Sequence, residues 1–451
     1  MGKQLMIVEV SQKQAYIFSS QGSHENRKRS YEIARVTSQA FFQAVCPDGY
    51  FPEENMVYTG GGHAVLQFPD KPSADTFARA LTLRVLKKYP EMELFVKQSE
   101  YREDWTPGEN LLALSQALEK KKALRSASFH MKRLGVEADR KYTSPNQRIT
   151  SDNGDYRVIV HIDGNAMGAR VAKVYEQSGN DWNLCRKNLQ RFSACIDQDF
   201  SAAYDAMAED LRRNAPANRP FPLHKILAAG DDLCFIVSAP HGLECAASFL
   251  RHLSKRKNSV DGDYYSACAG IAFVDKAIPF RQGYALSEAL CANAKRLAAD
   301  YGPGVSALDF QIISGFAKPS LQDYRSEYQA EDGSQLLLRP FAVTGNVPYN
   351  RSYQYLTDTI RKMQTPKHHY AYTSLVKQRP AFFQGQQEAL CALKPDRGLL
   401  VTQKMLRDNN GQYDLYFTDE DGILRCSIFD ALEISDTTIL WEGDPHGKRI
   451  P

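Results

Sequence analysis

One stretch of this sequence places two acidic residues between apolar segments. Residues 227–237 read Leu-Ala-Ala-Gly-Asp-Asp-Leu-Cys-Phe-Ile-Val, so Gly230, Asp231 and Asp232 separate two apolar runs. This pattern predicts a β-hairpin with two carboxylates at its tip, because glycine adopts the backbone angles of a tight turn. A Gly-Asp-Asp tripeptide by itself is also typical of an ordinary surface turn, so the surrounding sequence decides its interpretation.

A second apolar segment also ends on an acid. Residues 158–162 lead into Asp163, which Gly164 follows. If this strand lies beside the hairpin and ends at the same edge, Asp163 joins the other two carboxylates. Carboxylates this close repel one another, so such clusters normally persist because divalent cations neutralise them. Oxygen ligands select Mg²⁺ or Mn²⁺, and we therefore predict a site for two such ions.

Two divalent ions suit in-line phosphoryl transfer from a nucleoside triphosphate. Asp163, Asp231 and Asp232 are the predicted catalytic and metal-binding residues, and the Gly164 carbonyl is a further predicted metal ligand. Backbone N–H groups after the strand and cationic side chains on a later helix would hold phosphates. The predicted nucleotide-binding residues are Gly164, Asn165, Gly168, Gly230, Ser266, Lys295 and Arg296. A solvated helix lysine is the alternative interpretation of Lys295, and His161 is expected to pack within its strand.

The same order of predicted strands and helices occurs twice along the chain, and we call each occurrence a pass. The second pass contains the predicted site residues. The first pass predicts strands and helices at residues 5–10, 32–45, 57–68, 72–88 and 91–97, and the second at 157–162, 182–213, 223–238, 242–255 and 265–274. Each pass reads β-α-β-β-α-β, which is the order of a ferredoxin-like unit. We therefore predict an α+β protein with two ferredoxin-like domains and an internal duplication.

Alignment of the two passes places Ile7-Val8-Glu9-Val10-Ser11 on Ile159-Val160-His161-Ile162-Asp163. It also places the glycine-rich turn of residues 60–63 on residues 229–232. In this alignment Ser11, Gly62 and His63 stand where the second copy has its acids. Such residues cannot hold two divalent ions, so the first copy is predicted to be catalytically silent.

The remaining sequence divides the chain into four predicted parts. They are a degenerate first ferredoxin-like domain at residues 1–118, a basic linker or helix at 119–150, a catalytic second ferredoxin-like domain at 151–317 and a mainly helical C-terminal domain at 318–451. Residues 120–148 contain nine Lys and Arg against two acids. A solvated helix and linker is the simpler interpretation of this basic segment, and a surface for a phosphate backbone is the alternative.

Composition excludes several classes of protein. The chain has 451 residues, 43% of them hydrophobic, and a net charge of +3, which is too small to indicate nucleic-acid binding by itself. The nine cysteines include no C-x-x-C pair and suit a reducing compartment. No apolar run of about 18 residues occurs, and we expect no signal region, because Met1-Gly2-Lys3 leads directly into a strand-like segment. We expect a cytoplasmic protein without a membrane partner.

The sequence resembles the polymerase-like large subunit of type III CRISPR effector complexes over roughly residues 5 to 320. The segments that carry the resemblance are Asp163-Gly164-Asn165-Ala166-Met167-Gly168, similar to the family's D-x-D-x-x-G, and Ala229-Gly230-Asp231-Asp232, similar to its G-G-D-D. Weaker similarities cover residues 16–18, 60–62, 266–272, 279–280 and 285–295. Asn165 and Ala229 depart from the family pattern, but neither change removes the core carboxylates.

The resemblance implies two palm domains that make cyclic oligoadenylates from ATP for a downstream effector that responds to cyclic nucleotides. It implies metal binding by Asp163, Asp231 and Asp232 and triphosphate binding by Lys295. RNA or other effector subunits are the implied partners. The sequence has no His-Asp dipeptide, so a nuclease activity is not expected, and the chain would be a stand-alone or divergent member without a nuclease domain.

Two other functions remain open at this point. The palms could form a catalytically silent scaffold in an RNA-binding effector complex, in which the acids are vestigial. Alternatively, the protein could be a cyclase that makes a cyclic mononucleotide or dinucleotide, as the related GGDEF-type palms do. The mass of the product separates the cyclase from the oligonucleotide synthase.

Overall fold

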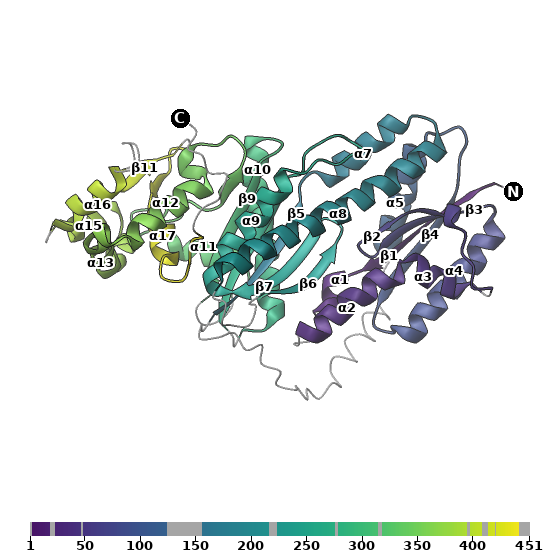
Figure 1. The fold of residues 1–451 in the computed structure, drawn as a ribbon, viewed down its shortest axis with the longest axis horizontal. Helices are drawn as coiled ribbons and strands as arrows, with labels where there is room; N and C mark the ends of the chain where they lie inside the picture. The colour runs from purple at the N-terminus through teal and green to yellow at the C-terminus, as the bar shows by residue number, and fades with distance from the viewer. Residues whose placement is uncertain are drawn as a thin grey trace.

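The structure is a computed structural model that describes residues 2–18, 23–46, 48–123, 156–215, 223–275, 278–313, 318–394, 397–407, 414–419 and 421–441. Its described part is an α+β protein with two large sheets and helices packed around them (Figure 1). The two sheets and a mainly helical C-terminal region follow one another along the long axis of the molecule. Most of the basic segment at residues 119–150 lies outside the described residues.

The first sheet has four antiparallel strands in the order β2-β3-β1-β4. These are β1 (Gln4–Ser11), β2 (Met56–Gly60), β3 (His63–Phe68) and β4 (Glu93–Glu100). The helices of this part are α1 (Lys13–Ile17), α2 (Ser23–Val36), α3 (Gln39–Val45), α4 (Lys71–Lys88) and α5 (Pro107–Ala123). The single helix predicted over residues 32–45 is therefore wrong, because Ser38 begins a new helix by accepting a hydrogen bond from the Phe41 N–H.

The second sheet has six strands in the order β10-β9-β8-β5-β7-β6. They are β5 (Tyr156–Gly164), β6 (Leu223–Ala229), β7 (Asp232–Ser238), β8 (Ala267–Asp275), β9 (Ser306–Ile313) and β10 (Phe341–Thr344). The sheet is mixed, because β8 and β9 are parallel and the other pairs are antiparallel. Its helices are α7 (Met167–Ser178), α8 (Trp182–Asn214), α9 (Gly242–Ser254) and α10 (Phe280–Tyr301).

Four strands of the second sheet repeat the order of the first. The series β6-β7-β5-β8 matches β2-β3-β1-β4 in order and in antiparallel pairing. Helix α5 follows β4 and packs on β4 and β1, as α10 follows β8 and packs on β8 and β5. The two parts are therefore built on the same plan, as the sequence predicted.

Helix α8 joins the two sheets. It packs on α9 of the second part and on β2 of the first. The Gln190 side chain donates to the Met56 carbonyl at 2.8 Å, and the Ser193 hydroxyl donates to the Thr59 carbonyl at 3.1 Å. These bonds hold the hairpin of the first sheet in a fixed relation to the second part.

The C-terminal region contributes β10 to the second sheet and is otherwise mainly helical. Its other elements are α11 (Leu321–Arg325), α12 (Tyr353–Gln364), α13 (His369–Lys377), α14 (Arg379–Gln384), α15 (Gln386–Leu393), α16 (Gly398–Arg407), α17 (Phe429–Ile434) and the short strands β11 (Tyr416–Thr418) and β12 (Leu424–Cys426). Within the described part of the chain, no helix combines the length and the apolar character that crossing a membrane requires.

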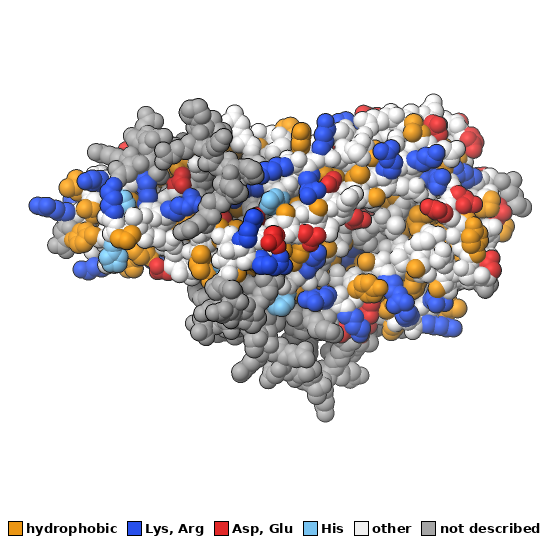
Figure 2. All heavy atoms as spheres, viewed as in Figure 1, with side chains coloured by type: hydrophobic (Ala, Val, Ile, Leu, Met, Phe, Trp, Pro, Cys, Tyr) orange, Lys and Arg blue, Asp and Glu red, His pale blue; other side chains and the backbone are white. Residues whose placement is uncertain are grey.

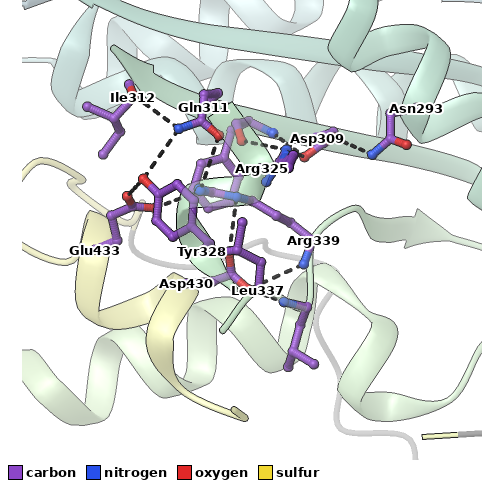
Figure 3. A network of polar contacts seen from close by, with 12 residues as sticks. Asn293, Asp309, Gln311, Ile312, Arg325, Tyr328, Leu337, Arg339, Asp430 and Glu433 are labelled. Carbon is purple, nitrogen blue, oxygen red and sulfur yellow. Dashed lines mark hydrogen bonds and ion pairs between the residues drawn. The ribbon is translucent and has the colours of Figure 1, made fainter. Parts of the chain in front are cut away.

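A buried polar network attaches this region to the second sheet (Figure 3). Arg339 lies between helix α17 and β9, with its Nη2 atom 2.8 Å from Glu433 and its Nε atom 3.3 Å from Asp430. Nearby, the Arg325 guanidinium donates to Asp309 of β9 at 2.6 Å. Because these charges are removed from water, their pairing fixes how α17 packs on the sheet.

Candidate functional site

The three predicted acids lie together at one edge of the second sheet. Asp163 on β5 and Asp232 on β7 are directly opposite each other in the antiparallel pair, and Asp231 occupies the turn of the β6–β7 hairpin. Gly230 precedes it with φ +66°, a left-handed angle that glycine adopts without strain. The predicted hairpin is thus confirmed, with its two carboxylates at the tip.

Two backbone contacts hold the hairpin tip in place. The Gly164 N–H donates to the Asp231 carbonyl at 3.2 Å, and the Gly230 N–H donates to Oδ1 of Asp197 on α8 at 3.0 Å. A Cβ atom on Gly164 would lie 2.9 Å from Asp231 Cβ and 2.6 Å from Met167 Cε. Glycine is therefore required here so that β5 and the hairpin can approach each other closely.

Lys295 lies against the end of β5. Its ammonium donates to Asp163 Oδ2 at 2.6 Å and to the Gly164 carbonyl at 2.8 Å. Burial acts to lower the pKa of Lys295, but the hydrogen bond and charge of Asp163 raise it overall. Lys295 is thus a partner of the predicted metal ligands and not a solvated helix lysine.

The carboxylates of the hairpin are difficult to ionise. Burial, followed by the charge of Asp163, raises the pKa of Asp231 to about 6. Burial and the charges of Asp163, Asp231 and Glu288 raise the pKa of Asp232 to about 8. A cation placed among these groups would lower both pKa values, because it favours the charged forms.

Asp232 has one oxygen that nothing in the described structure satisfies. Its Oδ1 atom is buried and has no hydrogen-bond partner among the described residues. His161 Nδ1 lies 3.5 Å away, but burial lowers the pKa of His161 to about 4, so the ring is neutral near pH 7. His161 packs against the Tyr284 ring within the core of the sheet. An unpartnered buried carboxylate oxygen is a feature that needs a ligand or a proton.

The other predicted nucleotide-binding residues are only partly gathered at this edge. Asn165 donates its backbone N–H to the Ser266 carbonyl at 2.9 Å and its side-chain amide to the Val305 carbonyl at 3.1 Å. Gly168 lies in the first turn of α7, with open space where a Cβ would stand. The exposed Arg296 donates to the Asn293 side chain on the same helix, away from Asp163.

The structure does not show the predicted metal site. Among the described residues, no group of three or more His, Cys, Asp or Glu side chains is arranged so that it could hold a metal ion. The Lys295 ammonium bonds to both Asp163 and the Gly164 carbonyl, which are two of the predicted ligands. Of the predicted ligands, Asp231 and Asp232 line the adjacent cavity, and neither has a Lys or Arg side chain at bonding distance among the described residues.

This cavity lies between the two parts of the chain and has a volume of about 820 Å³. Asp231 and Asp232 line one side of it, and residues of the first part line the other, among them Glu9, Ser11, Lys13, Gln14, Tyr58 and Lys122. The two hairpin tips nearly touch, since a Cβ on Gly61 would be 3.5 Å from the Ala229 carbonyl. A larger cavity of about 1070 Å³, lined mainly by the first part and also by Trp182 and Asn183 of α8, contains none of the predicted site residues.

The strand register corrects the predicted alignment of the two copies. Asp163 lies opposite Asp232 in the second sheet, and Glu9 lies opposite His63 in the first. Because His63 follows its hairpin turn as Asp232 does, Glu9 and not Ser11 is the counterpart of Asp163. The prediction of Ser11 at that position is wrong by two residues. The sequence interpretation did not place Glu9, Lys13 or Lys122 beside this cavity, which all three line.

Fold and site together define a two-sheet α+β protein with an acidic hairpin facing an interdomain cavity. No family model and no curated protein matches the sequence. Solved structures do match its fold. A chain of the apo Csm1–Csm4 cassette has a TM-score of 0.62 at 13% identity, covering 97% of this chain and 70% of that chain.

Two further structures agree. The Csm1–Csm4 subcomplex of the type III-A CRISPR-Csm interference complex gives a TM-score of 0.60 at 12% identity, and the Csm1–Csm4 cassette in complex with cA4 gives 0.59 at 12%. Each covers 97% of this chain and 70% of the matched chain. At these identities the likeness establishes a shared fold, which is that of a chain in the type III CRISPR Csm cassette.

Proposed function

We propose that this protein is a nucleotidyltransferase that condenses nucleoside triphosphates, with ATP the expected substrate, into a cyclic or linear oligonucleotide messenger. Its two sheets would be two ferredoxin-like palm domains, of which the second is catalytic and the first holds the other nucleotide. The observation that carries the proposal is the register of Asp163 opposite Asp232, with Asp231 beside them at the mouth of the interdomain cavity.

The ligand atoms that these residues supply are of the kind that Mg²⁺ and Mn²⁺ prefer, and they would suit two such ions. Asp163, Asp231, Asp232 and the Gly164 carbonyl supply oxygen only, which these ions prefer. The buried, unpartnered Oδ1 of Asp232 and the raised pKa values of Asp231 and Asp232 are both features that a bound cation would relieve. When bound, the ions would activate the attacking hydroxyl and neutralise the leaving pyrophosphate.

The protein side chains would then align the reaction. The second palm would hold the triphosphate of one nucleotide, with Lys295 close to its phosphates. The first palm would present the 3′-hydroxyl of the other nucleotide across the cavity, in line with the α-phosphate. Lys295 would exchange its present bond to Asp163 for a phosphate oxygen, since ammonium groups bind both anions.

The fold likeness supports an adenosine product and a defence role. A cassette of the same fold binds cA4, and type III CRISPR effectors supply the context in which such a product would reach a downstream effector. RNA or other effector subunits are the proposed partners of this chain. These assignments go beyond the fold and are proposals for this protein.

The deciding experiment incubates the purified protein with each nucleoside triphosphate and Mg²⁺ or Mn²⁺ and identifies products by mass spectrometry. An oligonucleotide from the wild type, absent from an Asp231→Ala/Asp232→Ala variant, is the expected result. Product mass would also separate an oligonucleotide from the cyclic mononucleotide or dinucleotide of a GGDEF-like cyclase. Unchanged turnover in the double variant would refute the assignment of these acids.

A catalytically silent scaffold for an RNA-binding complex is the second candidate. It is favoured by the lack of a metal-ready arrangement within the described residues and by the ion pair that occupies Asp163. On the face shown in Figure 2, however, Lys and Arg side chains are interspersed with acidic and uncharged ones and form no single patch. Tight RNA binding that weakens steeply with salt, without any nucleotide product, would support the scaffold.

A further inference from the structure

Two buried polar side chains lie behind the acidic edge of the second sheet, and the proposed reaction does not use them. His161 on β5 precedes Asp163 by two residues, so the two side chains lie on the same face of the strand. His161 is 6% exposed, and Tyr284 on α10 is 2% exposed. Their rings pack edge to face with centroids 5.5 Å apart, and the Tyr284 hydroxyl lies 3.3 Å from His161 Nδ1. Tyr284 thus restricts the orientation of the imidazole.

The same imidazole nitrogen lies close to Asp232. His161 Nδ1 is 3.5 Å from Asp232 Oδ1, the buried oxygen that has no hydrogen-bond partner among the described residues. This separation is too long for a strong hydrogen bond, but a movement of about 0.5 Å would give an ordinary one. The Asp232 side chain is nevertheless 34% exposed and lines the interdomain cavity, which leaves Oδ2 as the oxygen that faces the cavity. The two oxygens of this carboxylate therefore have different surroundings.

Tyr284 is itself held by the first part of the chain. The centroid of the Phe18 ring lies 4.1 Å from that of Tyr284, and the Gln14 side chain on α1 donates to the Tyr284 hydroxyl at 3.4 Å. The same Gln14 amide also donates to Glu288, which lies one turn further along α10. These contacts limit the movement of Tyr284, so its hydroxyl stays beside His161.

The position of the proton on His161 follows from its neighbours. Because burial lowers the pKa of His161, its imidazole is neutral near pH 7 and carries a single N–H. A proton on Nδ1 can be shared between two acceptors, which are Asp232 Oδ1 and the Tyr284 hydroxyl oxygen. A proton on Nε2 would instead turn the lone pair of Nδ1 toward the carboxylate, which is unfavourable when Asp232 is ionised. An ionised Asp232 therefore selects the Nδ1–H form.

We propose that His161 and Tyr284 are positioning residues for Asp232: the His161 Nδ1–H holds the inner oxygen, Oδ1, and Tyr284 orients the imidazole. The outer oxygen, Oδ2, then faces the cavity, where it is available to a divalent cation. The inference rests on the proposed function for the role of that cation. A neutral donor leaves the negative charge of Asp232 intact, whereas Lys295 offsets the charge of Asp163. Side chains that hold a metal ligand in this way typically change metal affinity about 10- to 100-fold when they are removed.

The test measures binding of Mn²⁺ alone to the purified protein by electron paramagnetic resonance, which requires neither nucleotide nor turnover. His161→Phe keeps an aromatic ring against Tyr284 and removes the donor, so Mn²⁺ should bind about tenfold or more weakly. His161→Asn should recover part of the affinity, because its amide nitrogen stands close to the position of Nδ1. His161→Gln, whose amide nitrogen corresponds to Nε2, should not. Tyr284→Phe removes only the hydroxyl and should have a smaller effect than His161→Phe.

A double-mutant cycle separates positioning from a general structural role. If His161 acts through Asp232, then His161→Phe should weaken Mn²⁺ binding in the wild type and have no further effect in an Asp232→Asn variant. A structural loss would weaken binding in both backgrounds. His241→Asn is the matched control, because His241 is a buried histidine that accepts a hydrogen bond from Trp441 away from the acids. It should leave Mn²⁺ affinity unchanged, and melting temperatures would show that each variant folds.

The outcome can be separated from that of the proposed function. Normal Mn²⁺ binding by His161→Phe, or an equal loss in the Asp232→Asn background, would overturn the inference even if the protein makes an oligonucleotide. Mn²⁺ affinity that depends on His161 in a protein without any product would support the positioning pair and count against the condensation reaction. Wild-type protein that binds no Mn²⁺ would overturn both proposals.

Discussion

Glu9 and Asp163 occupy equivalent positions in the two sheets, each opposite the residue that follows a hairpin turn and each paired with a lysine from the equivalent helix. The two halves therefore share one plan and differ at their hairpins. Gly62 and His63 stand where the second half has Asp231 and Asp232, whereas both halves have a lysine at the same position of the following helix.

Lys295 is expected to act on the substrate phosphates. Lys295→Met should raise KM for the triphosphate about tenfold or more, because a charge-assisted contact is lost. Lys295→Arg should retain part of the affinity. Arg296→Met is the matched control, since this neighbouring cation is exposed and bonded to Asn293. Equal effects of the two methionine variants in steady-state kinetics would contradict a specific role for Lys295.

The acidic hairpin should make the metal-free protein less stable as pH rises. In the unfolded chain both acids titrate near pH 4, whereas the folded protein has pKa values of about 6 for Asp231 and about 8 for Asp232. The folded state therefore binds more protons between about pH 4 and 8, and the free energy of unfolding falls across this window. Because both side chains are partly exposed, we expect a loss of about 1 to 2 kcal/mol.

Melting temperatures measured in EDTA at about pH 5 and about pH 8 would show how strongly stability falls with pH. Asp231→Asn/Asp232→Asn should reduce this fall, and Mg²⁺ should restore the stability of the wild type most at the higher pH. An unchanged slope in the asparagine variant would show that other groups are responsible.

Gly164 should be intolerant of any side chain. In Gly164→Ala the new Cβ would lie 2.6 Å from Met167 Cε and 2.9 Å from Asp231 Cβ, so the hairpin must move. We expect a stability loss of about 1 to 3 kcal/mol and an activity loss of about 10²-fold. Gly168→Ala is the control, because nothing lies within 4 Å of its Cβ position. This control should resemble the wild type both in its denaturant unfolding and in the amount of product that it forms.

The buried network of Figure 3 should fix the C-terminal region to the second sheet. Arg339→Met would leave Asp430 and Glu433 without their buried cation, at a cost of about 3 to 5 kcal/mol. Arg379→Met removes a half-exposed cation 3.9 Å from the same Glu433 and should cost less than about 1 kcal/mol. Limited proteolysis and urea unfolding would measure both variants. Similar stabilities would show that the network does not hold this region in place.

Much of the site could be predicted from local sequence pattern. Apolar runs that end on acids indicated that Asp163, Asp231 and Asp232 lie at one sheet edge, because strand length and turn residues fix where a hairpin bends. The element order likewise predicted the duplication of the strand plan. Lys295 and Arg296 could not be told apart by pattern, since successive helix residues point about 100° apart and only packing decides which one faces the strand.

The missed residues depended on tertiary structure for a physical reason. Side chains alternate along a strand, so a shift of two residues keeps the same face of the strand toward the core. The apolar pattern of β1 therefore fits equally well with Glu9 or Ser11 in the place of Asp163, and only pairing with β3 chose Glu9. The sequence by itself determined the acidic hairpin and its strand. The packing of the two halves decided that Lys13 and Lys122 face it across one cavity.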